Sequence, residues 1–173
     1  LELVNEVLDM GKLESGEIVL ESCPFNVIEL KDGILQTMER AAAERGITMT
    51  DRTEVKHTAL IGSPLHLKRL LMNIWSNAIK YNNPGGTVSI TIEHVGTQAK
   101  IVIADNGIGI PLQAQSRIFE RFYRVDKSRS KQRGGTGLGL SIVKHGAALH
   151  HAAIHVDSEP GEGTAITLTF PAG

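Results

Sequence analysis

The stretch that decides the fold is 70-LLMNIWSNAIKY-81, in which polar and apolar residues recur with the period of a helix. At about 100° per residue, Asn73, Asn77 and Lys80 fall within one narrow arc and form a polar stripe. Apolar residues flank this stripe on both sides: Leu67, Leu70, Leu71, Ile74 and Ala78 on one, Leu65, Met72 and Ile79 on the other. A solvated helix face would instead lie opposite a single apolar face. Because amide and ammonium groups framed by apolar surface need partners, the stripe predicts a site for an anionic, metal-bearing ligand.

Length and composition are those of one globular domain. The chain has 173 residues, 41% of them apolar, and a net charge of -1. Its single cysteine, Cys23, excludes an internal disulfide bond. No apolar run approaches the roughly 20 residues needed to span a bilayer, so we expect no direct membrane contact from this fragment. The chain begins in the middle of a pattern, which predicts a cytoplasmic fragment of a longer protein.

Apolar residues at helical spacing over residues 1–13 predict the end of an amphipathic helix, although a solvated helix is an alternative. Ser15 and Gly16 end it, so we expect one segment at 1–14 and one domain at 15–173. Helices are predicted over 27–45, 64–81, 113–122 and 137–149, and strands over 17–21, 47–50, 57–61, 87–94, 100–104, 153–157 and 164–170. This order predicts an α+β fold, an α/β sandwich with a mixed, mostly antiparallel five-stranded sheet and three helices on one face. Residues 107–135 show little periodicity and predict a long functional lid.

The segment 105-DNGIG-109 follows a predicted strand directly. A carboxylate at a strand end can accept a hydrogen bond from the exocyclic amine of adenine, where guanine would present a repelled carbonyl oxygen. Gly107 and Gly109 allow the backbone to bend tightly and to approach a ligand closely. Taken alone, the segment could equally be a hairpin turn or an Asx-turn.

A second glycine-rich segment, 134-GGTGLGL-140, opens a predicted helix. Glycines at 135, 137 and 139 present unhindered backbone N–H groups at the positive end of that helix, where phosphates bind well. The spacing is neither the dinucleotide GxGxxG nor the GxxxxGK[ST] loop. A flexible hinge is the alternative for this segment in isolation.

Between the two glycine motifs, residues 117–133 contain seven Lys or Arg and two Asp or Glu, a local charge of +5. Phe119 and Phe122 are expected to anchor this segment on the core while the cations beside them reach a polyphosphate. A solvated loop and a site for single-stranded nucleic acid are the alternatives. The flanking glycine motifs favour the polyphosphate, and we expect no nucleic-acid partner.

Five segments resemble, in order, the N, G1, F, G2 and G3 boxes of bacterial sensor histidine kinases: 73–81, 105–109, 118–124, 134–140 and 161–164. The catalytic domain of that family has an ATP-binding sandwich, shared with gyrase-type and mismatch-repair ATPases, in which the long loop is the ATP lid. The sequence from 122 to 128 is similar to membrane kinases of the phosphate-sensing type.

The resemblance implies ATP and Mg²⁺ as cofactors. Asn77 would ligate the Mg²⁺ ion, Asn73 would support the metal and the phosphates, and Lys80 would neutralise phosphate charge. Asn73, Lys80 and Arg124 would be catalytic. Besides these, the implied nucleotide contacts are Tyr81, Asp105, Gly107, Ile108, Gly109, Ile110, Tyr123, Arg124, Gly135, Thr136, Gly137, Leu138, Gly139, Leu140 and Thr164.

The resemblance also implies partners. Residues 1–14 would end the second dimerisation helix, and the phospho-accepting histidine would lie upstream, so we expect this fragment not to phosphorylate itself. The partners would be the chain's own dimerisation domain, a second copy in the full-length homodimer and a response regulator, beneath a bacterial inner membrane. A serine kinase or an ATPase of the same superfamily, or a non-catalytic nucleotide-binding module, is the alternative. Asn73 argues against hydrolysis, because it stands where the hydrolysing relatives carry a water-activating glutamate.

At the end of the predicted helix 137–149 the family usually has His-Gly-Gly, whereas this chain has 150-HHA-152. Because histidine tolerates a left-handed backbone better than most residues, we expect a strained or re-routed helix end at His151. A metal site at His150 and His151 is disfavoured, since no correctly spaced partners accompany them. Trp75 is interpreted as a packing residue.

Overall fold

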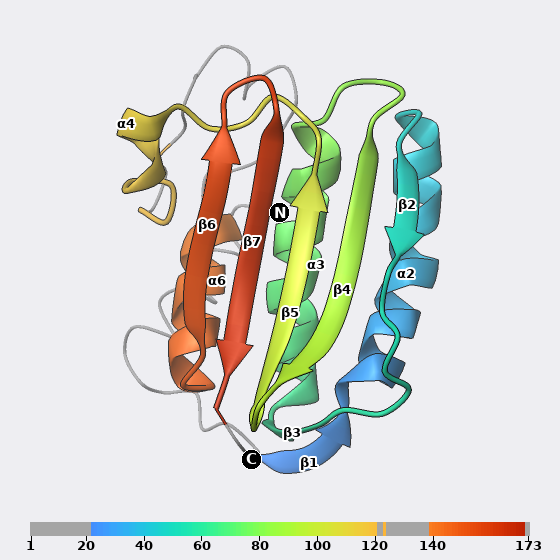
Figure 1. The fold of residues 1–173 in the computed structure, drawn as a ribbon, viewed down its shortest axis with the longest axis vertical. Helices are drawn as coiled ribbons and strands as arrows, with labels where there is room; N and C mark the ends of the chain where they lie inside the picture. The colour runs from blue at the N-terminus through green and yellow to red at the C-terminus, as the bar shows by residue number, and fades with distance from the viewer. Residues whose placement is uncertain (1–21, 121–122, 124–138, 172–173) are drawn as a thin grey trace, which may run out of the picture.

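The structure, a computed structural model, describes residues 22–120, 123 and 139–171. Its main sheet has the strand order β2-β4-β5-β7-β6, in which β2 is parallel to β4 and the other pairs are antiparallel. These strands are β2 (Thr48–Asp51), β4 (Thr87–Val95), β5 (Gln98–Asp105), β6 (Ala153–Glu159) and β7 (Gly163–Phe170). Three helices cover one face of the sheet (Figure 1): α2 (Val27–Glu44), α3 (Pro64–Lys80) and α6 (Gly139–Leu149). The predicted α+β sandwich is confirmed.

Two smaller features differ from the prediction. The strand predicted at 57–61 is β3 (Ala59–Gly62), which leaves the main sheet and pairs with an unpredicted strand, β1 (Cys23–Asn26), at one end of the molecule (Figure 1). The helix predicted over 113–122 is wrong in extent: α4 covers only Leu112–Gln115, because Pro111 provides no side-chain cap and turns follow to Phe119. The strand predicted at 17–21 and the segment 1–14 lie outside the described residues.

Helix α3 begins as its sequence predicts. Ser63 is the N-cap, its hydroxyl accepts a hydrogen bond from His66 N, and Pro64 occupies the first helical position. The apolar side chains of α3 then pack between the sheet and its two neighbouring helices, and they include Leu67, Leu70, Leu71, Ile74, Trp75, Ala78 and Ile79. One residue of the predicted second flank is wrong: Leu65 is 74% exposed, because the first turn packs through Leu67 on its opposite side. Ile79 of the same flank is 3% exposed, and Met72 is partly buried against the core.

Trp75 fills the centre of this core. Its side chain is 0% exposed, in agreement with a packing role. Within the described ranges, its Nε1 is the buried side-chain nitrogen that finds no hydrogen-bond partner. The apolar contact area of the indole therefore outweighs an unsatisfied donor, whose cost is about 1–3 kcal/mol.

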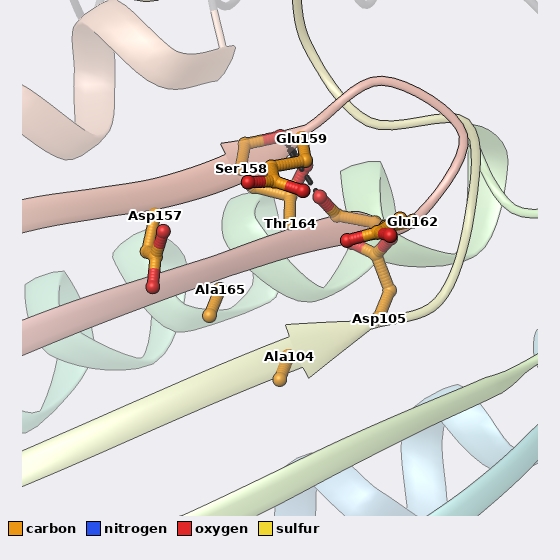
Figure 2. Close-up of a pocket in the computed structure, with 9 residues that line it drawn as sticks. Ala104, Asp105, Asp157, Ser158, Glu159, Glu162, Thr164 and Ala165 are labelled. Carbon is orange, nitrogen blue, oxygen red and sulfur yellow. Dashed lines mark hydrogen bonds between the residues drawn. The ribbon is translucent and has the colours of Figure 1, made fainter.

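The β6–β7 turn brings the ends of three strands together. Residues 160–162 connect β6 to β7, and Thr164 pairs with Ser158 on one side and with Asp105 of β5 on the other. The close-up in Figure 2 shows Asp105 beside this turn. The 105–109 segment therefore leaves the sheet next to the β6–β7 turn.

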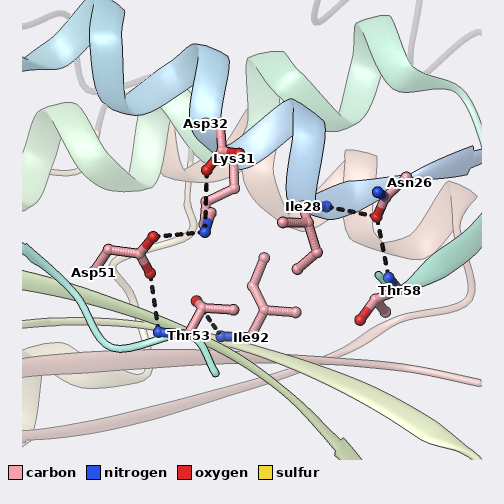
Figure 3. Close-up of polar contacts among 8 residues, drawn as sticks. All are labelled: Asn26, Ile28, Lys31, Asp32, Asp51, Thr53, Thr58 and Ile92. Atoms are coloured by element: carbon pink, nitrogen blue, oxygen red, sulfur yellow. Dashed lines mark hydrogen bonds and ion pairs between the residues drawn. The ribbon is translucent and has the colours of Figure 1, made fainter. Parts of the chain in front are cut away.

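A buried lysine of α2 forms an ion pair with the edge strand β2 (Figure 3). Lys31 is 4% exposed, and its Nζ lies 2.6 Å from Asp51 Oδ2 and 3.2 Å from Asp32 Oδ1. Asp51 also accepts a hydrogen bond from Thr53 N, while Thr53 Oγ1 accepts one from Ile92 N. Burial lowers the pKa of Lys31, but its bonds to Asp51 and Asp32 outweigh this and raise the pKa above 10.5. Burial likewise raises the pKa of Asp51, but the bond from Lys31 leaves that pKa below 3.8.

Helix α6 ends in a Schellman motif without glycine. Ala152 N donates to Ala147 O at 2.9 Å and His151 N donates to Ala148 O at 3.1 Å. His151 has a φ of 57°, the one positive φ outside glycine in the described residues. A left-handed backbone at His151 is therefore observed, while the expected strain stays a prediction.

We expect Lys31→Ala to lower the free energy of unfolding by about 1–2 kcal/mol at pH 7, because the packing of the buried Lys31 side chain is lost and Asp51 loses its cation. Urea denaturation measures it. Since the native pKa of Asp51 is lowered, the stabilisation is present at neutral pH and should fade as the pH drops below about 4. Arg40→Ala is the control, because it breaks the exposed Arg40–Glu44 pair and should change stability by less than about 0.5 kcal/mol. Equal losses for both variants would contradict the assignment.

We expect His151→Gly to raise the free energy of unfolding by about 0.5–1 kcal/mol, because glycine adopts a positive φ without steric cost. The matched control is Ala148→Gly, three residues earlier in the same helix, which should lower stability by about as much. Thermal or urea unfolding of both variants and of the parent chain measures these changes in stability. A loss of stability in both would mean that His151 carries no backbone strain.

Candidate functional site

The polar stripe of α3 faces the beginning of α6. Asn73, Asn77 and Lys80 are all partly exposed, and Asn73 Nδ2 donates to Arg69 O at 3.1 Å. A Cβ atom on Gly139 would lie 3.3 Å from Asn73 Oδ1 and 3.9 Å from Asn77 Nδ2. The first residue of α6 is thus packed against both amides. The structure brings the stripe and the end of the second glycine segment together, as their separate patterns predict.

The amide groups lie against the first described turn of α6, where the sequence predicts the positive end of the helix. The first backbone N–H groups of a helix have no partner inside it and carry a partial positive charge. Lys80 lies one turn beyond Asn77 on the same stripe and adds a full positive charge. An anion with several oxygen atoms fits this combination of backbone donors, amides and an ammonium group.

The turn after β5 packs against the other end of α3. Ile108 N donates to Tyr81 O at 3.1 Å, and Tyr81 is the C-cap residue of α3. A Cβ atom on Gly107 would lie 2.5 Å from the same Tyr81 oxygen, so only glycine fits there. Asp105 Oδ1 accepts a hydrogen bond from Gly107 N at 2.9 Å. The carboxylate is therefore held in place relative to the helix that carries the stripe.

The same turn is closed on its other side by the β6–β7 turn. Gly161 N donates to Ile108 O at 2.8 Å. Gly109 has a φ of 71° and Gly163 a φ of 121°, and a Cβ on either would overlap backbone atoms, of Glu159 and of Asp105 respectively. Glycine is required at both positions because two backbone segments touch there.

Asp105 is the most perturbed titratable group of this site. Burial raises its pKa to about 6, while hydrogen bonds from the backbone N–H groups of Gly107 and Thr164 act in the opposite direction. A carboxyl group with this pKa is ionised at neutral pH and accepts hydrogen bonds. Desolvation makes such a bond stronger than on the surface, which suits recognition of an amine on a flat ring.

A shallow hollow of about 350 Å³ lies beside Asp105 (Figure 2). It is lined by Ala104, Asp105, Asp157, Ser158, Glu159, Glu162, Gly163, Thr164 and Ala165. The lining contains four carboxylates and none of the stripe residues of α3. Because carboxylates repel phosphate, a nucleotide would direct its phosphates away from this hollow and towards the stripe.

Tyr123 lies under a cation. The Arg117 guanidinium carbon is 4.5 Å from the centroid of the Tyr123 ring, and Arg117 Nε pairs with Glu120 Oε2 at 3.1 Å. Of the other predicted contacts, Ile108, Ile110, Leu140 and Thr164 are half-buried. Arg124, Gly135, Thr136, Gly137 and Leu138 lie outside the described residues, and their roles stay predictions.

Two asparagines that sequence reasoning missed hold the beginning of β4. Asn82 is 6% exposed and its Nδ2 donates to Thr87 O at 3.0 Å, while Asn106 Oδ1 accepts from Thr87 N at 2.7 Å. Both therefore connect the two ends of the site to one strand. The position of Asn82, directly after a predicted helix and before Asn83-Pro84, could have indicated this role, because asparagine side chains often form hydrogen bonds with nearby backbone groups.

His150 has a structural role. Its Nε2 accepts a hydrogen bond from Ser63 N at 3.1 Å and its Nδ1 donates to Gly146 O at 2.8 Å, so both ring nitrogens are used. Among the residues that the structure describes, no group of three or more His, Cys, Asp or Glu side chains is placed to hold a metal ion.

Comparison with known proteins identifies related sequences and folds. The family model described as "Histidine kinase-, DNA gyrase B-, and HSP90-like ATPase" matches residues 62–173. The sensor-like histidine kinase SenX3 of Mycolicibacterium smegmatis is 36% identical over 170 residues, which cover 98% of this chain and 44% of SenX3. The chain spans less than half the length of the curated relatives that it matches.

Solved structures agree with this similarity. Full-length ShkA in complex with AMPPNP has a TM-score of 0.86 and 28% identity, over 99% of this chain and 36% of that one. The mycobacterial sensor histidine kinase MprB has a TM-score of 0.77 and 33% identity, over 86% of this chain and 97% of that one. Across the described ranges of the present chain, none of the helices is long and apolar enough to cross a membrane.

The pKa of Asp105 predicts a pH dependence of stability. Since burial raises the native pKa, the folded state binds more protons than the unfolded state between pH 4 and 6, and stability should fall as the pH rises through that window. The contribution is up to about 1.4 kcal/mol per pH unit. Urea denaturation at several pH values should show this slope in the parent chain and a flatter one in Asp105→Asn. Glu93→Gln, an exposed acid on β4, should keep the parent slope; a parallel curve for Asp105→Asn would refute the assignment.

Proposed function

Because this chain belongs to the histidine kinase-, DNA gyrase B- and HSP90-like ATPase family, we propose that it is the ATP-binding catalytic domain of a sensor histidine kinase. In this role it transfers the terminal phosphoryl group of ATP to a histidine on a dimerisation domain. The observation that supports the proposal best is the packing of Gly139 against Asn73 and Asn77, because it joins two amides to the helix that the second glycine segment is predicted to open.

Different residues bind the two ends of the nucleotide, its base and its phosphates. The ionised Asp105 accepts a hydrogen bond from the exocyclic amine of adenine, and Tyr81 packs beside the nucleotide. The backbone at 135–140 and Lys80 hold the phosphate oxygens. Because the acidic hollow beside Asp105 repels phosphate, the nucleotide has one favourable orientation.

The α3 amides fit a magnesium ion held mainly by phosphates. Mg²⁺ prefers oxygen ligands and binds through a few protein groups together with phosphates and water. Asn73 Oδ1 faces Gly139 while its nitrogen is bonded to Arg69 O, and Asn77 would ligate the ion directly. When bound, the ion neutralises phosphate charge and orients the reacting group.

In the transfer, an imidazole nitrogen of the acceptor forms a bond to the terminal phosphorus, and the bond from that phosphorus to the bridging oxygen of ADP breaks. Lys80, and Arg124 from the lid, stabilise the charge that develops on the oxygens. Asn73 is an amide and cannot accept a proton from water as a general base, so the phosphoryl group is spared from hydrolysis. Tyr123, which contacts the Arg117 guanidinium, belongs to the same predicted lid.

The full-length protein would be a homodimer at a bacterial inner membrane, with a response regulator as its second partner. The similarity to SenX3, a sensor-like histidine kinase, supports this assignment. The dimerisation domain would supply the phospho-accepting histidine.

Calorimetric titration with ATP, ADP, GTP and single-stranded RNA tests the binding step. We expect ADP and ATP to bind, ATP with a requirement for Mg²⁺, and GTP to bind far more weakly. Asp105→Asn should weaken ATP binding about 10- to 100-fold, because a hydrogen bond to a charged group contributes about 1.5–3 kcal/mol. Asn83→Ala, an exposed change in the loop after α3, is the control. RNA binding that survives Asp105→Asn would instead support a nucleic-acid module.

Phosphorylation of a separately supplied dimerisation domain tests the transfer step. Labelled phosphate from ATP should appear on a histidine of that domain, and Asn77→Ala should abolish the transfer. Release of free phosphate without labelled histidine would indicate an ATPase, and label on serine would indicate a serine kinase.

A further inference from the structure

The hydroxyl of Ser158 is the centre of a small hydrogen-bond network beside the turn formed by residues Asp105 to Ile110, here called the Asp105–Ile110 turn. Its Oγ accepts from Ile110 N at 2.9 Å, donates to Gly163 O at 2.9 Å and lies 2.8 Å from Thr164 Oγ1. A hydroxyl has one proton and two lone pairs. With Thr164 as the donor of the third bond, every hydrogen-bonding capacity of Ser158 is used.

Gln115 completes the network from α4. Its Nε2 donates to Ile110 O at 3.0 Å and to Ser158 O at 2.9 Å. Ile110 is therefore held at both of its backbone groups, at the nitrogen by Ser158 and at the oxygen by Gln115. The last residue of the Asp105–Ile110 turn cannot move without breaking these bonds.

The network lies in register with Asp105. Ser158 on β6 is opposite Thr164 on β7, and Thr164 is opposite Asp105 on β5. Figure 2 shows Ser158 and Thr164 together at the β6–β7 turn, with Asp105 on the neighbouring strand. The turn is thus fixed at its beginning by the sheet, in its middle by Gly107 against Tyr81 O, and at its end by Ser158 and Gln115.

We propose that Ser158 and Gln115 are positioning residues that hold the Asp105–Ile110 turn in the conformation that recognises adenine. The proposal rests on the proposed function, since it assigns these side chains to the base-recognition part of the same site. Neither side chain needs to touch the nucleotide. Each acts through Ile110, whose backbone N–H and C=O lie outside the helices and strands.

Nucleotide affinities of four variants test the proposal. Ser158→Ala and Gln115→Ala should weaken ATP and ADP binding about five- to tenfold, the effect of losing about one hydrogen bond, while GTP binding changes less. The preference for adenine over guanine should shrink accordingly. Ser158→Thr keeps the hydroxyl and should stay within about twofold of the parent chain. Gln113→Ala, an exposed residue of the same helix α4, is the matched control.

A second measurement does not depend on nucleotide binding. Carbon-detected NMR titration of the Asp105 carboxyl group should give a midpoint near 6 in the parent chain, and Ser158→Ala should lower it, because a loosened turn admits water. Glycines 107, 109 and 163 remain, so the variant is expected to fold, and its urea unfolding is recorded in parallel.

The outcomes separate this inference from the proposed function. If the parent chain binds no adenine nucleotide, the proposed function fails, and the carboxyl titration still decides whether Ser158 positions the turn. If the parent chain binds ATP but Ser158→Ala keeps both the adenine preference and the Asp105 midpoint, this inference is overturned even where stability falls. Failure of Ser158→Thr to restore the adenine preference would overturn the role of the hydroxyl.

Discussion

The structure depends on helix α3 burying apolar side chains on both sides of a polar stripe. On one side Leu70, Leu71 and Ile74 are at most 2% exposed, and on the other Ile79 is 3% exposed. Asn73 and Asn77, between them, are partly exposed. A helix that packs on one side only could turn its polar face to bulk water. Here α6 packs against the stripe through Gly139, where a Cβ atom would lie 3.3 Å from Asn73 Oδ1. The core that stabilises the fold therefore also builds the walls of the site.

The family and the main helices and strands could be predicted from the sequence, because each motif or element is encoded by residues that are close together in the chain. The helical period of α3, its cap at Ser63-Pro64 and the Gly96-Thr97 turn between β4 and β5 all depend on residues a few positions apart. The matched family model bears out the recognition. The pairing of β1 with β3 could not be predicted in this way, since it joins segments more than 30 residues apart with short, irregular patterns. The length of α4 depended on a missing cap rather than on apolar spacing.

In the candidate site, too, local patterns could be predicted and contacts between distant segments could not. The sequence pointed to Gly107 and Gly109 through the flexibility of glycine, but the structure gives a second reason: each touches backbone of another segment, at Tyr81 and at Glu159. Such contacts across the chain leave no periodic signal. Ser158 bonds to Ile110 across 48 positions, and nothing in the neighbourhood of Ser158 in the sequence marks that partner. Residues that act by joining distant segments are those that a pattern cannot assign.

The way in which the Asp105 turn is held has a consequence for base recognition. A buried carboxylate is costly to desolvate, and burial raises the pKa of Asp105 to about 6 although backbone hydrogen bonds from Gly107 and Thr164 oppose the shift. A mobile loop would relieve this cost by letting the group reach water, so the carboxylate stays buried only where its turn is fixed. Glycine contacts fix the middle of the turn, and side-chain hydrogen bonds fix its end. The rigidity of the turn and the strength of the proposed adenine bond at Asp105 are thus linked, because the fixed turn keeps water away from the carboxylate and a hydrogen bond to a desolvated carboxylate is stronger.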